Sequence, residues 1–256
     1  MFSSDVQPSL VSIFSSTGSE PLSTFLSSTD KSLPSDSFIC FCNDATSLPH
    51  PRLPATLVSP STNEQGAPDY ALQQTVLHIQ SPTLRTTFIR CPPFRDANGP
   101  SGHLGMKHPW IHFQVRNMGR ECSLEIGLVD QSGREGVVRC STFQREPLLR
   151  LGNPPLLHLP LLLPSSSSRL LTSWCTINLN LPALLPHFLS ASLLRPDGDE
   201  DADSLDSDDE DDVPAGTYSY VSYVKVYATC RLRRIWFSED GPKQRLPWEF
   251  QLYAAD

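Results

Sequence analysis

The sequence predicts an all-β protein, in which antiparallel strands pack as a sandwich or a barrel. Several segments alternate apolar and polar residues with a period of two, as strands with one buried face do. No segment shows a long helical period, so at most short helices are expected. Only 39% of the residues are hydrophobic, and Ser- and Pro-rich stretches separate the patterned segments. The chain can therefore build a core, but not every segment can belong to it.

The alternation locates four strands. Apolar residues occupy every second position over 111–115, 124–128, 177–181 and 224–232. The Gln-Ser-Gly sequence at 131–133 is a turn signal that favours a hairpin after the second strand. Two prolines limit the Leu-rich segment 181–189 to a helical turn or two. Strands with one polar face are typical of antiparallel sheets.

Three stretches interrupt this pattern, at about 27–70, 152–172 and 195–217. They lack a sustained period and are rich in Ser, Pro or acidic residues, so we expect loops or disordered insertions there. Residues 1–256 are accordingly expected to form one domain that these insertions interrupt. The third stretch contains 11 acidic and no basic residues between Asp197 and Asp212. Without this run the net charge of −8 becomes +3, so the rest of the chain is mildly basic.

Ser207 is a candidate phosphorylation site within the acidic run. Three acidic residues follow it directly, a context that an acid-directed kinase accepts, and a phosphate would add further negative charge. The run lacks the ligand spacing of a calcium loop, so a solvated loop is the ordinary interpretation.

The chain is expected to be soluble and intracellular. Its first residues lack the basic and apolar regions of an export signal. The most apolar stretch, Leu156–Leu163, is broken by Pro160 and is shorter than the roughly 20 residues that a membrane span needs. Seven cysteines at irregular spacings fit reduced thiols better than a disulfide framework.

The sequence contains no familiar catalytic or cofactor-binding motif. Walker, Rossmann, nucleophile-elbow and His-Glu-x-x-His patterns are absent. Cys40 and Cys42 lack a second pair at zinc-finger spacing. His103, His108 and His112 lack a nearby carboxylate. We therefore expect no enzyme activity, no cofactor, no metal and no small-molecule substrate.

One predicted strand carries a basic and aromatic face. If residues 222–233 form a single strand, the residues at odd positions share one face. These residues are Tyr223, Lys225, Tyr227, Thr229, Arg231 and Arg233, and Arg234 follows them. Arginines among aromatic residues suit docking to an acidic protein surface or to nucleic acid. The alternative is a solvated outer sheet face, on which basic residues discourage aggregation.

Several longer motifs occur in a characteristic order along the chain. The strongest are Cys-Arg-Leu-Arg-Arg-Ile-Trp-Phe-Ser at 230–238 and Leu-Pro-Trp-Glu-Phe-Gln-Leu-Tyr at 246–253. Upstream of them lie Gly-Ser-Glu-Pro-Leu at 18–22, Ile-Arg-Cys-Pro at 89–92, Leu-Gly-Met-Lys at 104–107, and Trp174 with Ile177. Together these motifs resemble the cilia- and flagella-associated protein 20 family, over about 159 of the 256 residues.

The resemblance implies a single antiparallel β-sandwich of jelly-roll type without catalytic activity. It implies a structural component of ciliary and flagellar doublet microtubules, in contact with tubulin and neighbouring proteins at the inner junction. The implied location is the axoneme or the basal body, and the implied role is to support assembly, stability and motility of the cilium. A nuclear association with RNA processing or transcription is also implied.

The chain departs from the family in its charges. After Asn180 and Leu181 the family continues with a pair of arginines, whereas this chain has Pro182-Ala183-Leu184-Leu185-Pro186. Because the exposed tails of tubulin are acidic, losing bases and adding an acidic run should weaken docking unless the run points away.

Other functions stay open at this point. A nuclear module, in a cell without cilia, would use the same basic face on RNA or on nuclear complexes. A cytosolic β-sandwich that binds glycans or an acidic ligand is a third alternative. A further hypothesis is that the acidic run folds back onto Lys225, Arg231 and Arg233 and occupies their face.

Overall fold

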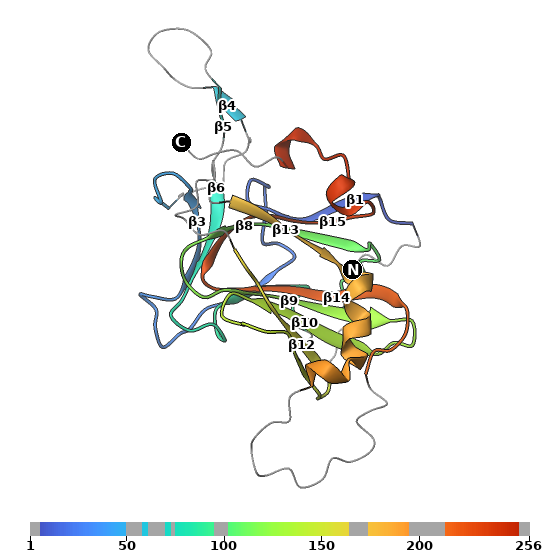
Figure 1. The fold of residues 1–256 in the computed structure, drawn as a ribbon. Helices are drawn as coiled ribbons and strands as arrows, with labels where there is room; N and C mark the ends of the chain where they lie inside the picture. Colours follow the sequence, from blue (N-terminus) through green and yellow to red (C-terminus); the bar gives the residue numbers. More distant parts are fainter. Residues whose placement is uncertain are drawn as a thin grey trace.

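Two β-sheets pack face to face in the computed structural model, which describes residues 6–49, 58–60, 70–72, 75–94, 102–163, 174–194 and 213–250 (Figure 1). One, called the β8 sheet here, has the order β13 (Trp174–Asn180), β8 (Trp110–Asn117), β15 (Cys230–Ser238), β6 (Thr75–Gln80) and β3 (Phe38–Asn43), with β1 (Leu10–Ser15) paired to β15. The other, called the β9 sheet, has the order β11 (Leu148–Arg150), β12 (Leu156–Pro160), β10 (Glu135–Ser141), β9 (Ser123–Asp130), β14 (Tyr218–Tyr227), β7 (Phe88–Cys91) and β2 (Leu26–Ser28). A separate ribbon pairs β4 (Val58–Pro60) with β5 (Tyr70–Leu72). The predicted all-β sandwich is confirmed.

The space between the two sheets holds the apolar side chains that the alternation predicts. Ile111 and Phe113 of β8 are fully buried, and Leu124 and Ile126 of β9 are no more than 2% exposed. All four belong to one hydrophobic cluster that both sheets contribute to. Each such side chain contributes about 1.5–3 kcal/mol through removal of its surface from water. The period-two pattern therefore identifies side chains that lie on the inner faces of both sheets.

The predicted hairpin is confirmed between β9 and β10, which pair antiparallel. The carboxylate of Asp130 accepts hydrogen bonds from the backbone N–H groups of Ser132 at 2.8 Å and Arg134 at 3.0 Å. Gly133 adopts a φ of 83°, which a residue with a Cβ rarely adopts. The turn thus depends on both a side-chain acceptor and a glycine.

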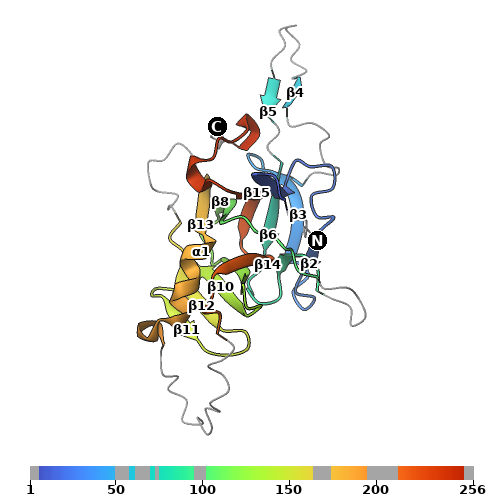
Figure 2. The same cartoon turned by 90° about the vertical axis from the view of Figure 1, so that its right-hand side faces the viewer.

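Short helices follow β13 and β15, and those after β13 close one end of the sandwich. The helix α1 (Leu181–Leu184) continues into 3-10 turns η1 (Leu185–Leu189) and η2 (Ala191–Leu193), while η4 (Gly241–Lys243) and η5 (Trp248–Phe250) follow β15. Figure 2 shows α1 in front of the two sheets, beside β10 and β12. Leu181, Leu185 and Phe188 are buried there. The prolines act as predicted, since the true α-helix has only four residues.

Two of the predicted insertions contain strands, which corrects the prediction for those residues. β3 lies within 27–70 and pairs with β6 over six residues, Phe38 to Asn43. β12 lies within 152–172 and pairs with β10 in parallel, an exception to the antiparallel expectation. Both strands are short apolar runs with Pro- or Ser-rich flanks. The composition of the surrounding stretch therefore predicts a loop although each run forms a strand. Residues 195–212, with Ser207, lie outside the described residues.

Candidate functional site

The basic and aromatic face predicted for 222–233 is divided between the two sheets. β14 ends at Tyr227 and pairs with β9 and β7, whereas β15 starts at Cys230 and pairs with β8, β6 and β1. The chain passes from one sheet to the other at Thr229, where two hydrogen bonds hold it. The N–H of Thr229 donates to the backbone carbonyl of Glu121 at 2.7 Å, and its hydroxyl donates to the backbone carbonyl of Ser81 at 3.0 Å. The single-strand prediction is wrong here, because the alternation continues across a change of sheet.

The arginines of β15 are buried instead of accessible. Arg231 is 5% exposed and Arg234 7%, and the side chain of Arg233 is 12% exposed. Arg233 stacks over the ring of Trp174 at 4.4 Å, and Arg234 over that of Phe250 at 4.6 Å. The expectation of an accessible Arg231, Arg233 and Arg234 face is therefore corrected.

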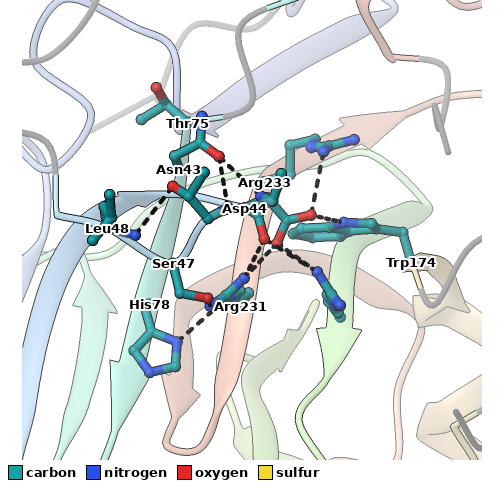
Figure 3. A network of polar contacts seen from close by, with 12 residues as sticks. Asn43, Asp44, Ser47, Leu48, Thr75, His78, Trp174, Arg231 and Arg233 are labelled. Carbon is teal, nitrogen blue, oxygen red and sulfur yellow. Dashed lines mark hydrogen bonds and ion pairs between the residues drawn. The ribbon is translucent and has the colours of Figure 1, made fainter. Parts of the chain in front are cut away.

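Asp44, in the turn after β3, is the acceptor that Arg231 and Arg233 of β15 surround together with Arg116 of β8 (Figure 3). Arg231 Nη1 donates to Oδ1 at 2.8 Å, Arg116 Nη1 donates to the same oxygen at 3.0 Å, and Trp174 Nε1 donates to Oδ2 at 2.6 Å. Burial acts to raise the pKa of Asp44, but the donors from Arg231 and Trp174 outweigh it and lower that pKa. The cluster joins β3, β8, β13 and β15, which indicates a structural role.

Tyr223 and Tyr227 of β14 lie on the outer face of the other sheet, around Glu125. This carboxylate is 5% exposed and accepts hydrogen bonds from Tyr223 at 2.8 Å, Tyr227 at 3.1 Å and Arg139 Nε at 2.8 Å. Burial, then the charge of Glu125, raises the pKa of both tyrosines, so they stay protonated donors. We call Glu125, Arg139, Tyr223, Lys225 and Tyr227 the Glu125 cluster.

Lys225 lies in the same cluster, stacked on aromatic rings. Its Nζ lies 3.8 Å from the ring centre of Phe88 and 4.4 Å from that of Tyr227. Arg90 similarly stacks over Tyr223 at 4.4 Å. Cation–π contacts of this kind contribute about 0.5–2 kcal/mol each. The structure therefore brings Tyr223, Lys225 and Tyr227 together without the arginines of β15.

A cleft of about 590 Å³ opens beside this cluster and carries three arginines. We call it the arginine cleft, and it is lined mainly by Arg85, Arg139, Arg150, His158, Phe143 and Tyr227. Its described lining contains no acidic residue. Arg139 is held by Glu125, with Nη2 2.6 Å from a carboxylate oxygen, while Arg85 and Arg150 form no ion pair with another described residue. The arrangement can bind anionic groups, because guanidinium groups pair with oxyanions in a fixed geometry.

His158 forms the buried wall of the arginine cleft. It is 7% exposed, its Nε2 is hydrogen bonded to Ser141 Oγ at 2.7 Å, and its ring meets the edge of Phe143 at 5.6 Å. Burial, then the charges of Arg139 and Arg150, lowers the pKa of His158 to about 4. The ring is therefore neutral at pH 7.

Sequence reasoning missed this cleft, because its arginines come from the turn before β7, from β10 and from β11. One signal was available, since Arg139 lies between the apolar Val138 and Cys140 of a strand and must face outward. Arg85 and Arg150 lie near Arg139 because of the order of the strands in the sheet, and the sequence does not reveal that order.

The histidines singled out above have separate partners. His108 is bonded to the carbonyl of Pro8 at 2.6 Å, and His112 to Asn178 and Ser238 at 2.6 and 2.7 Å. Among the described residues, no group of three or more His, Cys, Asp or Glu side chains could hold a metal ion. No helix in the described part of the chain is long and apolar enough to cross a membrane.

Comparison with known proteins gives consistent matches. The CFA20 domain matches residues 64–194. The chain is 26% identical to the cilia- and flagella-associated protein 20 of Chlamydomonas reinhardtii, over 72% of this chain and 77% of that protein. It is 24% identical to the proteins of that name from Caenorhabditis elegans and Paramecium tetraurelia, over 72% of this chain and 72% and 76% of theirs.

Proposed function

Because the chain belongs to the CFA20 domain family, we propose that it is a non-enzymatic structural protein of ciliary and flagellar doublet microtubules. In this proposal it binds tubulin and neighbouring proteins at the inner junction and supports assembly, stability and motility of the cilium. The relatives reported above are named as cilia- and flagella-associated, and the match extends over 72% of this chain. That match is the observation that carries the proposal. The proposed location is the axoneme or the basal body.

The site geometry supports binding better than catalysis. Two hydrogen-bonded pairs resemble a nucleophile with its base, Ser238 with His112 and Ser141 with His158. Both serines are fully buried, however, and burial lowers the pKa of both histidines, to about 4 for His158, so each is a weak base at neutral pH. The Glu125 cluster and the arginine cleft instead offer positive charge and aromatic surface on a rigid sheet, which suits an acidic partner.

Imaging tests the cellular part of this proposal. The full chain, tagged and expressed in its own cells, is compared with markers for tubulin and for DNA. We expect signal along axonemes or at basal bodies. A nuclear or diffuse signal, in cells whose axonemes remain unlabelled, would contradict the proposal.

A binding assay tests the molecular part. The full chain is sedimented with isolated doublet microtubules at low and at moderate salt, beside the variants Lys225→Gln and Arg245→Gln. Lys225 belongs to the Glu125 cluster, whereas Arg245 is exposed on the segment after β15 and serves as the matched control. We expect binding that weakens with salt and that Lys225→Gln reduces more than Arg245→Gln. Absence of sedimentation at low salt would count against tubulin as the partner.

The second candidate is a nuclear module that binds RNA or nuclear complexes. The observation that favours it is the same positive surface, with Arg90 and Lys225 stacked on aromatic rings. It predicts RNA binding with a steep salt dependence. A nuclear signal in the imaging experiment would make this candidate the stronger of the two.

A further inference from the structure

Three features of the arginine cleft distinguish it from an ordinary solvated surface. Arg139 is fixed from behind by Glu125, so its free face is held toward the cleft. Arg85 and Arg150 are exposed at the rim without an ion pair to another described residue. Phe143 is 41% exposed beside them, so its ring offers apolar surface next to the charges. Fixed and free cations thus flank an apolar surface.

We propose that the arginine cleft binds a carboxylate-rich segment of a partner protein. In this arrangement Arg139 pairs with one carboxylate at the centre of the cleft, while Arg85 and Arg150 pair with others along the same segment. Phe143 packs against the apolar stems of the acidic side chains. The inference goes beyond the proposed function, because it concerns the chemistry of one cleft and holds wherever the chain is located.

The volume and charge of the cleft favour several carboxylates over a single small ion. A volume of about 590 Å³ is within the range of about 300–1,000 Å³ that is typical of clefts for drug-sized ligands, so the cleft has room for more than one small ion. Its three arginines come from three separate elements of the chain. One small anion would leave cations without a partner, whereas a run of Asp or Glu residues supplies an acceptor for each.

The aromatic groups favour a peptide over RNA. Single-stranded RNA binds such surfaces by stacking its bases on open aromatic faces. Tyr227 is 8% exposed, Lys225 lies over its ring, and the ring of Phe88 packs against it at a tilt of 58°. Phe143 meets His158 edge to face at 78°. Among the described lining residues, a flexible acidic side chain finds more partners than a base does.

The test measures binding of a fluorescent 12-residue peptide of Glu and Gly to the full chain by anisotropy. The same peptide with Gln in place of Glu and a 12-nucleotide oligouridine are the comparison ligands. The double variant Arg85→Gln and Arg150→Gln removes the rim charges, and Arg245→Gln, outside the cleft, is the matched control. We expect the double variant to lose at least tenfold in affinity for the Glu peptide, the control variant less than twofold, and the Gln peptide not to bind.

Equal affinity of the double variant and the control variant would overturn the proposal, as would tighter binding of oligouridine than of the Glu peptide.

A second readout follows the NMR signals of the His158 imidazole during titration with the Glu peptide. The charged groups that act on this ring are Arg139, Arg150 and Glu125, on β10, β11 and β9. Carboxylates that neutralise the two arginines should raise its pKa. Unshifted His158 signals at saturation would place the peptide elsewhere and reject the proposal, and measuring these signals in the double variant checks that it is folded.

Discussion

Arg231 donates from Nη1 to both the backbone carbonyl and the carboxylate of Asp44, at 2.7 and 2.8 Å, across 187 positions of the chain. This pair fastens the turn after β3 to the strand β15, and Nη2 of the same arginine reaches the hydroxyl of Ser47 at 2.5 Å. Both charged side chains are almost completely buried. A buried pair of this kind is costly to break, because the remaining charge has no solvent to stabilise it.

Asp44→Asn should therefore strongly destabilise the fold. The change keeps the shape of the side chain but removes the negative charge that Arg231 and Arg116 share. We expect a loss of roughly 3–5 kcal/mol in the free energy of unfolding, measured by urea denaturation. Asp36→Asn is the control, since Asp36 is exposed and should change stability by less than about 0.5 kcal/mol. Equal effects of the two substitutions would show that the Asp44 network contributes little.

Arg231→Glu should unfold the chain before it affects any docking. The new carboxylate would lie against the buried Asp44, and two like charges at this site repel without screening. We expect loss of the cooperative thermal transition followed by circular dichroism. The exposed Arg245→Glu should melt like the wild type. A folded Arg231→Glu protein that fails only in partner binding would restore Arg231 as a docking residue.

The sequence predicts the strands of this fold better than it predicts the site. The alternation over 111–115 and 124–128 reflects burial of one face, which is a local property and is visible without the structure. The alternation over 224–232 has the same appearance, but Thr229 turns the chain into the other sheet. A periodic pattern reports which side chains face a core, and it does not report which sheet each half of the pattern joins. For this reason residues 222–233 do not form the single face that the sequence predicts.

The contacts that define the two clusters are equally hidden from sequence reasoning. Asp44 lies in a stretch that composition assigns to a loop, and nothing local indicates that it meets Arg231. Glu125 alternates with core residues of β9, so an outward position could be predicted. Its burial could not, because Tyr223 and Arg139 cover it from two neighbouring strands.

Gly136→Ala should loosen the end of the sandwich that η1 closes. An added Cβ would lie 2.7 Å from Cζ of Phe188 and 2.7 Å from Cγ of Pro214, far inside normal contact distance. We expect a loss of about 1–3 kcal/mol in the free energy of unfolding by urea denaturation. Adding Phe188→Leu shortens the opposing side chain and should recover part of the loss, so the double variant should be less destabilised than the sum of the single variants. Simple additivity would contradict this account of the contact.

Stability should fall as the pH drops from 6.5 towards 4, with His158 as a main cause. In the folded chain the pKa of this histidine is lowered to about 4, whereas an unfolded chain has an ordinary value near 6.5. Between these values the unfolded state binds a proton that the folded state does not bind, so acid favours unfolding. The contribution is fully present above about pH 6.5 and is lost progressively down to about pH 4, on the order of 3 kcal/mol in total. The lowered pKa values of His78 and His112 act in the same direction.

Urea denaturation at a series of pH values measures how steeply the free energy of unfolding falls between pH 6.5 and pH 4. This slope against pH should be shallower for His158→Gln than for the wild type, because glutamine does not titrate and can still hydrogen bond to Ser141. Identical slopes for the two proteins would mean that His158 takes up its proton equally well in the folded state, and would contradict the account of the neutral ring beside Arg139 and Arg150.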